Sequence, residues 1–115
     1  MSIRRWEIYR ANLDPIVGFE QGKTRPVLVI SEDAANDALR VVNVLPITSR
    51  KPGRRIYGNE ALLPVGTSSL PTESIVLAYQ IRTLDKQRLS TRYGRVFDVH
   101  IQAEIIEALT LQLGL

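Results

Sequence analysis

The clearest signal of the fold is the run Pro26-Val27-Leu28-Val29-Ile30, an uninterrupted apolar stretch that follows a polar loop. A short, continuous apolar run of this kind is typical of a strand buried on both faces. Similar runs cover Val41–Ile47 and Ser74–Leu84, while Ile3–Ala11 alternates in polarity and Ile56–Leu63 gives the weakest signal. Glycine and proline residues separate these segments, as expected for turns. The chain is therefore predicted to begin as a series of short strands.

The pattern changes near the C-terminus, where apolar residues recur at every fourth position: Ile101, Ile105, Leu109 and Leu113. This spacing predicts an amphipathic helix. Asp98 is a suitable N-cap and Gly114 a suitable stop. A single helical turn is also predicted at Ser31–Asn36. Short strands followed by one helix predict a mainly β fold, a small and strongly bent barrel with the helix packed on it.

The length of 115 residues suits a single domain, residues 1–115, with a core of its own. The chain has no cysteine, which excludes disulfides and thiolate metal sites and agrees with a reducing compartment. We recognise no signal peptide and no apolar stretch of membrane-spanning length. The sequence therefore predicts a cytoplasmic protein that does not bind membranes.

The charge is +3 with a pI of about 9.6, and twelve of the fifteen cations are arginine. The planar guanidinium fork matches phosphate oxygens and stacks on bases, so the bias towards arginine favours a polyanionic ligand. A GC-rich genome would produce the same bias by codon usage. Composition alone leaves these two explanations open.

The first segment with functional potential is the loop Gly18–Pro26, which leads directly into the buried strand. Its glycines, Gly18 and Gly22, allow backbone to come close to a ligand. Arg25 lies where the loop becomes strand, so a rigid element would fix its guanidinium. The alternative is an ordinary solvated connection between two strands.

The second segment is Leu45–Ser49, a predicted buried strand that ends in the hydroxyls of Thr48 and Ser49. A basic cluster follows at once: Arg50, Lys51, Arg54 and Arg55. Hydroxyls and cations in this order suit phosphate contacts and an electrostatic path for single-stranded nucleic acid. A solvated hairpin tip has the same composition.

The third segment, Ser74–Leu89, alternates so that Gln80 and Arg82 share one face of the predicted strand. Gln80 would read a base edge, Arg82 would hold phosphate and Tyr79 would stack on a base. Packing explains the segment equally well.

The single histidine, His100, falls in the first turn of the predicted helix and is interpreted as a surface residue. A ribonuclease mechanism that needs two histidines is excluded by this count. The carboxylates are scattered, and no phosphate-binding glycine motif is present. We therefore expect neither a metal nor an organic cofactor.

Taken together and in this order, the segments resemble the MazF/PemK family of toxin–antitoxin endoribonucleases, also called mRNA interferases. The resemblance rests on Gly18–Gly22 followed by Arg25–Ile30, on Pro46–Ser49 and on Val76–Leu89. It extends from about Glu7 to the C-terminus. All of the motifs in sequence order, closed by a helix, identify the family better than any one motif.

The resemblance implies an SH3-like barrel of the MazF/PemK/CcdB type, assembled as a two-fold homodimer. It implies the toxin of a type II toxin–antitoxin system, which cleaves single-stranded RNA at short sequences without metal or ribosome and so inhibits translation and growth. Attack by the ribose 2′-hydroxyl would leave 2′,3′-cyclic phosphate and 5′-hydroxyl ends. The expected partners are mRNA and a cognate antitoxin with an acidic, partly disordered tail, with DNA contacted only indirectly through the antitoxin.

The resemblance also implies roles for particular residues. Arg25 and Thr48 match the family's active-site arginine and threonine, and Glu20 matches an acidic residue of the same loop, our candidate base. We expect further RNA contacts from Gln21, Lys23, Ser49, Arg50, Lys51, Arg54, Arg55, Gln80 and Arg82. The chain departs from the family where Trp6 replaces a frequent glycine and Tyr79 an acidic residue, so sequence specificity is not carried over.

Two other functions compete with the nuclease. A gyrase poison on the same fold would carry a tryptophan in its C-terminal tail, whereas the only tryptophan here is Trp6. A non-catalytic SH3-like module would line a groove with aromatic residues, and only 6% of this chain is aromatic. Both alternatives are therefore disfavoured.

Overall fold

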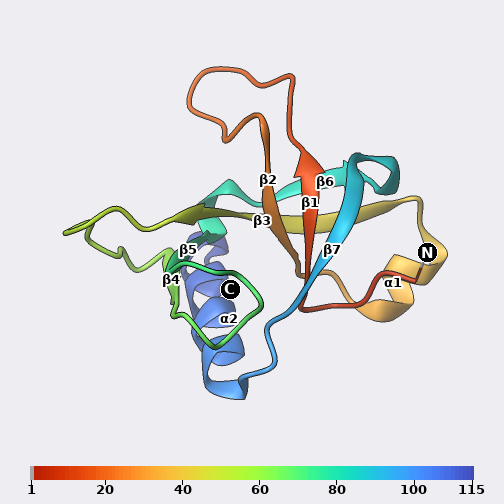
Figure 1. The fold of residues 1–115 in the computed structure, drawn as a ribbon. Coiled ribbons are helices and arrows are strands. Elements are labelled where there is room, and N and C mark those ends of the chain that lie inside the picture. Colours follow the sequence, from red (N-terminus) through yellow and green to blue (C-terminus); the bar gives the residue numbers. More distant parts are fainter. Residues whose placement is uncertain (1) are drawn as a thin grey trace.

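Seven antiparallel strands form one bent sheet in the computed structural model, which describes residues 2–115 (Figure 1). The strands are β1 (Glu7–Asn12), β2 (Thr24–Val29), β3 (Val41–Ser49), β4 (Glu60–Leu63), β5 (Ser74–Leu77), β6 (Arg82–Asp85) and β7 (Leu89–Arg95). Their order is β4-β5-β3-β2-β1-β7, with β6 also paired to β3. The prediction of a mainly β fold with a C-terminal helix is confirmed, although the sheet stays open between its end strands β4 and β7.

Strand β3 lies in the centre of the sheet and pairs with different strands along its length. Its first part pairs with β2 and β6, and its last residues pair with β5. Both β5 and β6 are antiparallel to β3, and the short 3-10 helix η1 (Ala78–Gln80) separates them. The prediction of one continuous strand over Ser74–Leu84 is therefore wrong, because η1 loops three residues out of the pairing. Gln80 and Arg82 accordingly belong to different elements.

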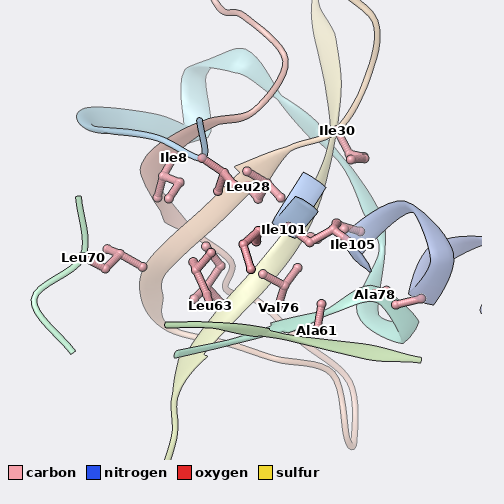
Figure 2. Close-up of a cluster of buried hydrophobic side chains, with 14 residues drawn as sticks. Ile8, Leu28, Ile30, Ala61, Leu63, Leu70, Val76, Ala78, Ile101 and Ile105 are labelled. Atoms are coloured by element: carbon pink, nitrogen blue, oxygen red, sulfur yellow. The ribbon is translucent and has the colours of Figure 1, made fainter. Parts of the chain in front are cut away.

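Helix α2 (Val99–Leu113) covers one side of the sheet, where its buried face completes the main apolar cluster (Figure 2). Asp98 caps it by accepting hydrogen bonds from the amides of His100 and Ile101. Gly114 ends it in the left-handed conformation, which glycine adopts without steric cost. The predicted helix and both of its ends are confirmed.

A second apolar cluster lies on the other face of the sheet. Its members come mainly from β1, β2 and β3 and are Ile3, Tyr9, Ala11, Leu13, Val27, Val29, Val42, Val44, Leu84 and Leu89. Strands β1 to β3 are thus buried on both faces, which explains the uninterrupted apolar run in β2. None of the helices in residues 2–115 is both long and apolar enough to cross a membrane.

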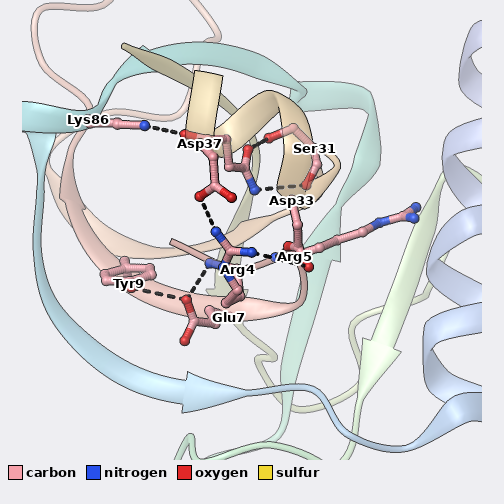
Figure 3. Close-up of polar contacts among 9 residues, drawn as sticks. Arg4, Arg5, Glu7, Tyr9, Ser31, Asp33, Asp37 and Lys86 are labelled. Carbon is pink, nitrogen blue, oxygen red and sulfur yellow. Dashed lines mark hydrogen bonds and ion pairs between the residues drawn. The ribbon is translucent and has the colours of Figure 1, made fainter. Parts of the chain in front are cut away.

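The N-terminal segment is held by polar contacts to α1 (Asp33–Ala38) and β1 (Figure 3). The Arg4 amide donates to Glu7 Oε1 at 2.6 Å, and the Arg4 guanidinium pairs with Asp37. Buried Glu7 also accepts from the Tyr9 hydroxyl and from Arg92. Burial alone raises the pKa of Glu7, but these hydrogen bonds outweigh it and lower the pKa overall.

Other boundaries differ from the predictions in ways that have local causes. Strand β1 begins only at Glu7 because Trp6 adopts a positive φ of 74°, which interrupts an extended chain. The weak signal at Ile56–Leu63 yields only the short strand β4, and β7 was not predicted. The predicted helical turn at Ser31–Asn36 is present slightly later, as α1.

Candidate functional site

Arg25 and Thr48 come from neighbouring strands at the point where those strands separate. The β2–β3 pairing ends at Val27 opposite Pro46. If this register is continued by two residues, Arg25 lies opposite Thr48. Residues opposite each other on antiparallel strands point to the same face of a sheet. On that register, both side chains lie on one face of the sheet, at neighbouring ends of β2 and β3.

The guanidinium of Arg25 is held by its own loop. Its Nε donates to the carbonyl of Gly22 at 3.0 Å, which leaves its two terminal nitrogens to contact a ligand. The chain packs closely here, because a β-carbon built at Gly22 would lie 2.7 Å from Asp14 Oδ1. Glycine at position 22 thus lets the loop fold tightly enough to fix Arg25.

Thr48 is half-buried and lines a cavity of about 330 Å³ at the ends of β2 and β3. Pro26, next to Arg25, lines the same cavity, as does Ser49. The predicted hydroxyl pair at the end of β3 therefore lines a recess that also includes Pro26, the chain neighbour of Arg25.

The loop between β1 and β2 (residues 13–23, the β1–β2 loop) is tied to η1 and β6. Gln80 accepts from the Gln21 amide at 3.3 Å and donates to the Phe19 carbonyl at 3.1 Å. Arg82 Nη1 donates to the carbonyls of Leu13 at 3.0 Å and Gln21 at 3.5 Å. Gln80 and Arg82 thus hold the shape of the β1–β2 loop through bonds to its backbone. Their predicted contacts with RNA remain predictions.

The other predicted residues of this loop are engaged within it. Glu20 is exposed, and its Oε1 accepts from the Val17 amide at 2.7 Å. Lys23 has a φ of 63°, unusual for a residue with a side chain. Its amide donates to Asp14 Oδ1 at 2.7 Å, which holds the backbone in this conformation. The loop is therefore a braced structure that presents Glu20 and Lys23 to solvent.

The basic cluster after β3 lies in residues 50–59, the basic loop, and two of its arginines are paired with acids. Arg50 contacts Glu73 at 3.1 Å, and Arg54 makes a bidentate pair with buried Glu60 at 2.8 and 2.7 Å. The hydrogen bonds from Arg54 lower the pKa of Glu60 and outweigh its burial. The pair likewise raises the pKa of Arg54.

The remaining cations of the basic loop are exposed. Lys51 lies at its tip, and the Arg55 guanidinium lies 5.2 Å from the centre of the Tyr57 ring. Within residues 2–115, Arg50 and Arg54 are the only cations of this loop that have a carboxylate oxygen within 4.0 Å of a side-chain nitrogen. Lys51 and Arg55 are thus the cations best placed to meet a polyanion.

Sequence reasoning missed the residues that brace the site. Glu60 and Glu73 neutralise predicted contact residues, and Arg88 donates to the carbonyls of Asn12 and Asp14 at 3.2 and 2.7 Å. A bond to a distant carbonyl leaves no trace in composition or periodicity. His100 lies exposed in the first turn of α2, as predicted. Within the described residues, no group of three or more His, Asp or Glu side chains is arranged to hold a metal.

Comparison with known proteins extends over almost the whole chain. Residues 4–113 match the family model described as "PemK-like, MazF-like toxin of type II toxin-antitoxin system". Endoribonuclease EndoA of Bacillus subtilis (strain 168) is 34% identical over 115 residues, which covers 100% of this chain and 97% of that protein.

Solved structures give the same result. MazF from Deinococcus radiodurans superimposes with a TM-score of 0.83 at 29% identity, covering 100% of this chain and 99% of that one. An endoribonuclease in complex with its cognate antitoxin from a Mycobacterial species superimposes with a TM-score of 0.79 at 26% identity, covering 98% and 96%.

Proposed function

This chain belongs to the PemK-like, MazF-like toxin family of type II toxin–antitoxin systems, and on that premise we propose that it is an endoribonuclease that cuts single-stranded RNA. The observation that carries the proposal is the placement of Arg25 and Thr48. They are distant in sequence, yet the β2–β3 register, continued by two residues beyond Val27 and Pro46, sets them opposite each other, and Thr48 lines a recess to which Pro26 also contributes. A guanidinium and a hydroxyl in this relation suit a single phosphodiester between them.

Cleavage by the 2′-hydroxyl needs a base, stabilisation of the charged phosphorane and an acid for the departing 5′-oxygen. We assign phosphorane stabilisation to Arg25, whose terminal nitrogens are oriented by the bond from Nε to Gly22. Thr48 holds the phosphate through its hydroxyl, with Ser49 beside it. Arg25 also acts as the acid: it donates a proton to the leaving 5′-oxygen and regains one from solvent. The products are 2′,3′-cyclic phosphate and 5′-hydroxyl ends, formed without metal.

The base that we propose is Glu20. One of its oxygens is occupied by the Val17 amide, which fixes the carboxylate at the loop tip and leaves the second oxygen to take the 2′-hydroxyl proton. Lys51 and Arg55 attract the RNA backbone. The substrate is unpaired because a splayed strand exposes its base edges, whereas a duplex conceals them. Cutting mRNA in the cytoplasm would stop translation and growth.

The test is incubation of a long unstructured RNA with the protein in EDTA, followed by mapping of the cut ends. We expect cuts at short sequences that carry 5′-hydroxyl ends. Arg25→Ala and Thr48→Ala should each lower the rate on the order of 10²–10³-fold and keep the wild-type melting temperature. Arg25→Lys keeps the positive charge and removes the planar guanidinium. Its rate therefore shows how much of the effect of Arg25 depends on bidentate contact with the phosphate. A folded Arg25→Ala variant with full activity would refute the assignment.

We also propose that the active form is a homodimer inhibited by an antitoxin with an acidic, partly disordered tail, through which DNA contact is indirect. Dimerisation is supported by a groove of about 900 Å³ between β4 and α2, flanked by exposed Leu111 and Leu115. Light scattering should give twice the chain mass, and Leu111→Glu should shift it to the monomer. Acidic peptides should inhibit cleavage less in high salt.

A further inference from the structure

The cavity beside Thr48 differs in chemistry from the surface around it. It measures about 330 Å³, near the lower end of the range for small-molecule sites, roughly 300–1,000 Å³. Pro26 of β2 and Thr48 of β3 are among the residues that line it. The side chains of residues 2–115 that line it are all uncharged, although the chain as a whole carries +3. A phosphate is therefore a poor occupant.

One wall is Tyr93, and a β-bulge directs it there. Strand β7 pairs Gly94 with Ile8 and Arg92 with Tyr9, so Tyr93 is an extra residue in the ladder. A bulge of this kind redirects a side chain and is common beside active sites. Tyr93 is 39% exposed and lines the cavity, so one part of its ring is accessible to a ligand.

A second wall is the connection between β4 and β5, residues 64–73, which contributes Ser69, Pro71 and Thr72. This wall is fixed. Leu70 is only 9% exposed and packs into the main apolar cluster, as Figure 2 shows. Gly94 has a φ of 148° and no room for a β-carbon, because Ser69 fills that space. The bulge and the connection therefore hold each other in place.

These features suit a planar, uncharged, partly polar ligand. A tyrosine ring offers a stacking surface, proline rings offer apolar contact, and the hydroxyls of Ser69 and Thr72 donate and accept hydrogen bonds. A nucleobase has this chemistry. We propose that the cavity binds the base of the nucleotide next to the scissile phosphodiester and so sets part of the cleavage sequence, an inference that rests on the proposed nuclease function.

The experiment compares wild type with Tyr93→Ala and Thr72→Val on RNA with randomised sequence, by sequencing the 5′-hydroxyl ends. Both variants should lose base preference at the same nucleotide beside the cut and keep the preferences elsewhere. On the preferred sequence, Tyr93→Ala should lower kcat/KM roughly tenfold to a hundredfold because the stacking surface is removed. Thr72→Val, which keeps side-chain shape and removes one hydroxyl, should lower it about two- to tenfold.

An abasic nucleotide at that position tests the contact from the side of the RNA. Wild type should lose about as much activity on the abasic RNA as Tyr93→Ala loses on the intact RNA, and Tyr93→Ala should be nearly insensitive to the missing base. Phe97→Ala is the matched control, because Phe97 is an aromatic residue, 61% exposed, that does not line the cavity. Its rate and preference should equal those of wild type.

Two results would overturn the inference while leaving the nuclease intact. One is a uniform loss of rate by Tyr93→Ala and Thr72→Val with every base preference unchanged. The other is equal sensitivity of wild type and Tyr93→Ala to the abasic nucleotide. A wild-type protein that cuts no RNA would instead refute the nuclease function itself, and the inference with it. A wild-type melting temperature for each variant would show that a loss of activity or of base preference does not come from misfolding.

Discussion

The two loops that flank the site both project from the sheet, and both were predicted to contact RNA, yet they are held in different ways (Figure 1). In the β1–β2 loop, Arg82 and Gln80 donate to backbone carbonyls. In the basic loop, Arg50 and Arg54 pair with the carboxylates of glutamates. Similar donors therefore meet neutral acceptors in one loop and charged acceptors in the other.

The two kinds of acceptor respond differently to pH. A carbonyl does not titrate, so the bonds that Gln80 and Arg82 donate to the β1–β2 loop are insensitive to acid. A carboxylate loses its charge on protonation, so the basic loop is coupled to pH. The first loop should govern the rate of the chemical step, and the second should govern stability and electrostatic attraction.

The largest effect is expected from Arg82→Met, which removes the clamp on both ends of the β1–β2 loop. Misplacement by about 1 Å of a group in a reacting site costs on the order of 100-fold, so kcat should fall by about this factor. Hydrogen exchange at the Gln21 amide should accelerate in parallel. The control is Arg40→Met, an exposed arginine just before β3, which should match wild type. An unchanged kcat together with faster hydrogen exchange at the Gln21 amide would show that the shape of the loop does not control the chemical step.

Next in size is the loss of stability in Arg54→Met. The substitution leaves the buried Glu60 carboxylate without its bidentate partner, and half-exposure of Arg54 moderates the cost. We expect the free energy of unfolding to drop by about 2–3 kcal/mol in urea denaturation. The double variant with Glu60→Gln should recover part of this loss. Additive single effects would mean that the pair is not coupled.

Acid should destabilise the protein through the same pair, by less than Arg54→Met does. The pKa of Glu60 is lowered in the folded state, so its contribution is present above the ordinary value of 4.5 and is lost as pH falls through the folded value. Urea denaturation between neutral pH and pH 3 should show a decline that is shallower in Glu60→Gln. Equal acid dependence in both proteins would place the effect elsewhere, for example at Glu7, whose pKa is also lowered.

The smallest effect belongs to Lys51→Ala and Arg55→Ala. Each should raise KM for RNA a few-fold and leave kcat unchanged. Each should also reduce the slope of log affinity against log salt by about 0.7 for every phosphate that the variant no longer neutralises. Melting temperatures should stay within about a degree or two, because both side chains are exposed. A fall in kcat for either variant would contradict the division of roles between the loops.

Much of the fold could be predicted from local pattern. The buried strand at Pro26–Ile30 and the capped helix from Asp98 to Gly114 are recognisable because period and capping are local properties. The break at Ala78–Gln80 could not be predicted, since the apolar run continues through it. It arises because β5 and β6 pair with different parts of the bent strand β3.

The candidate site divides in the same way. Arg25 and Thr48 were identified from their motifs, and the register of β2 and β3 supports their placement together. The same motifs did not indicate that Gln80 and Arg82 form hydrogen bonds with the backbone of the β1–β2 loop. They also gave no sign of the cavity wall at Tyr93, because a bulge is a property of two paired strands and not of either sequence alone.

The class of fold, the family and the residue types available for chemistry follow from the amino-acid order, because periodicity, capping and motif order are properties of short stretches of chain. The folded arrangement of the strands and loops sets which cations face solvent, which acids neutralise the others, and which uncharged side chains line the cavity that includes Thr48. Those outcomes depend on contacts between residues far apart in the chain. Such contacts exist only after the sheet has brought the residues together.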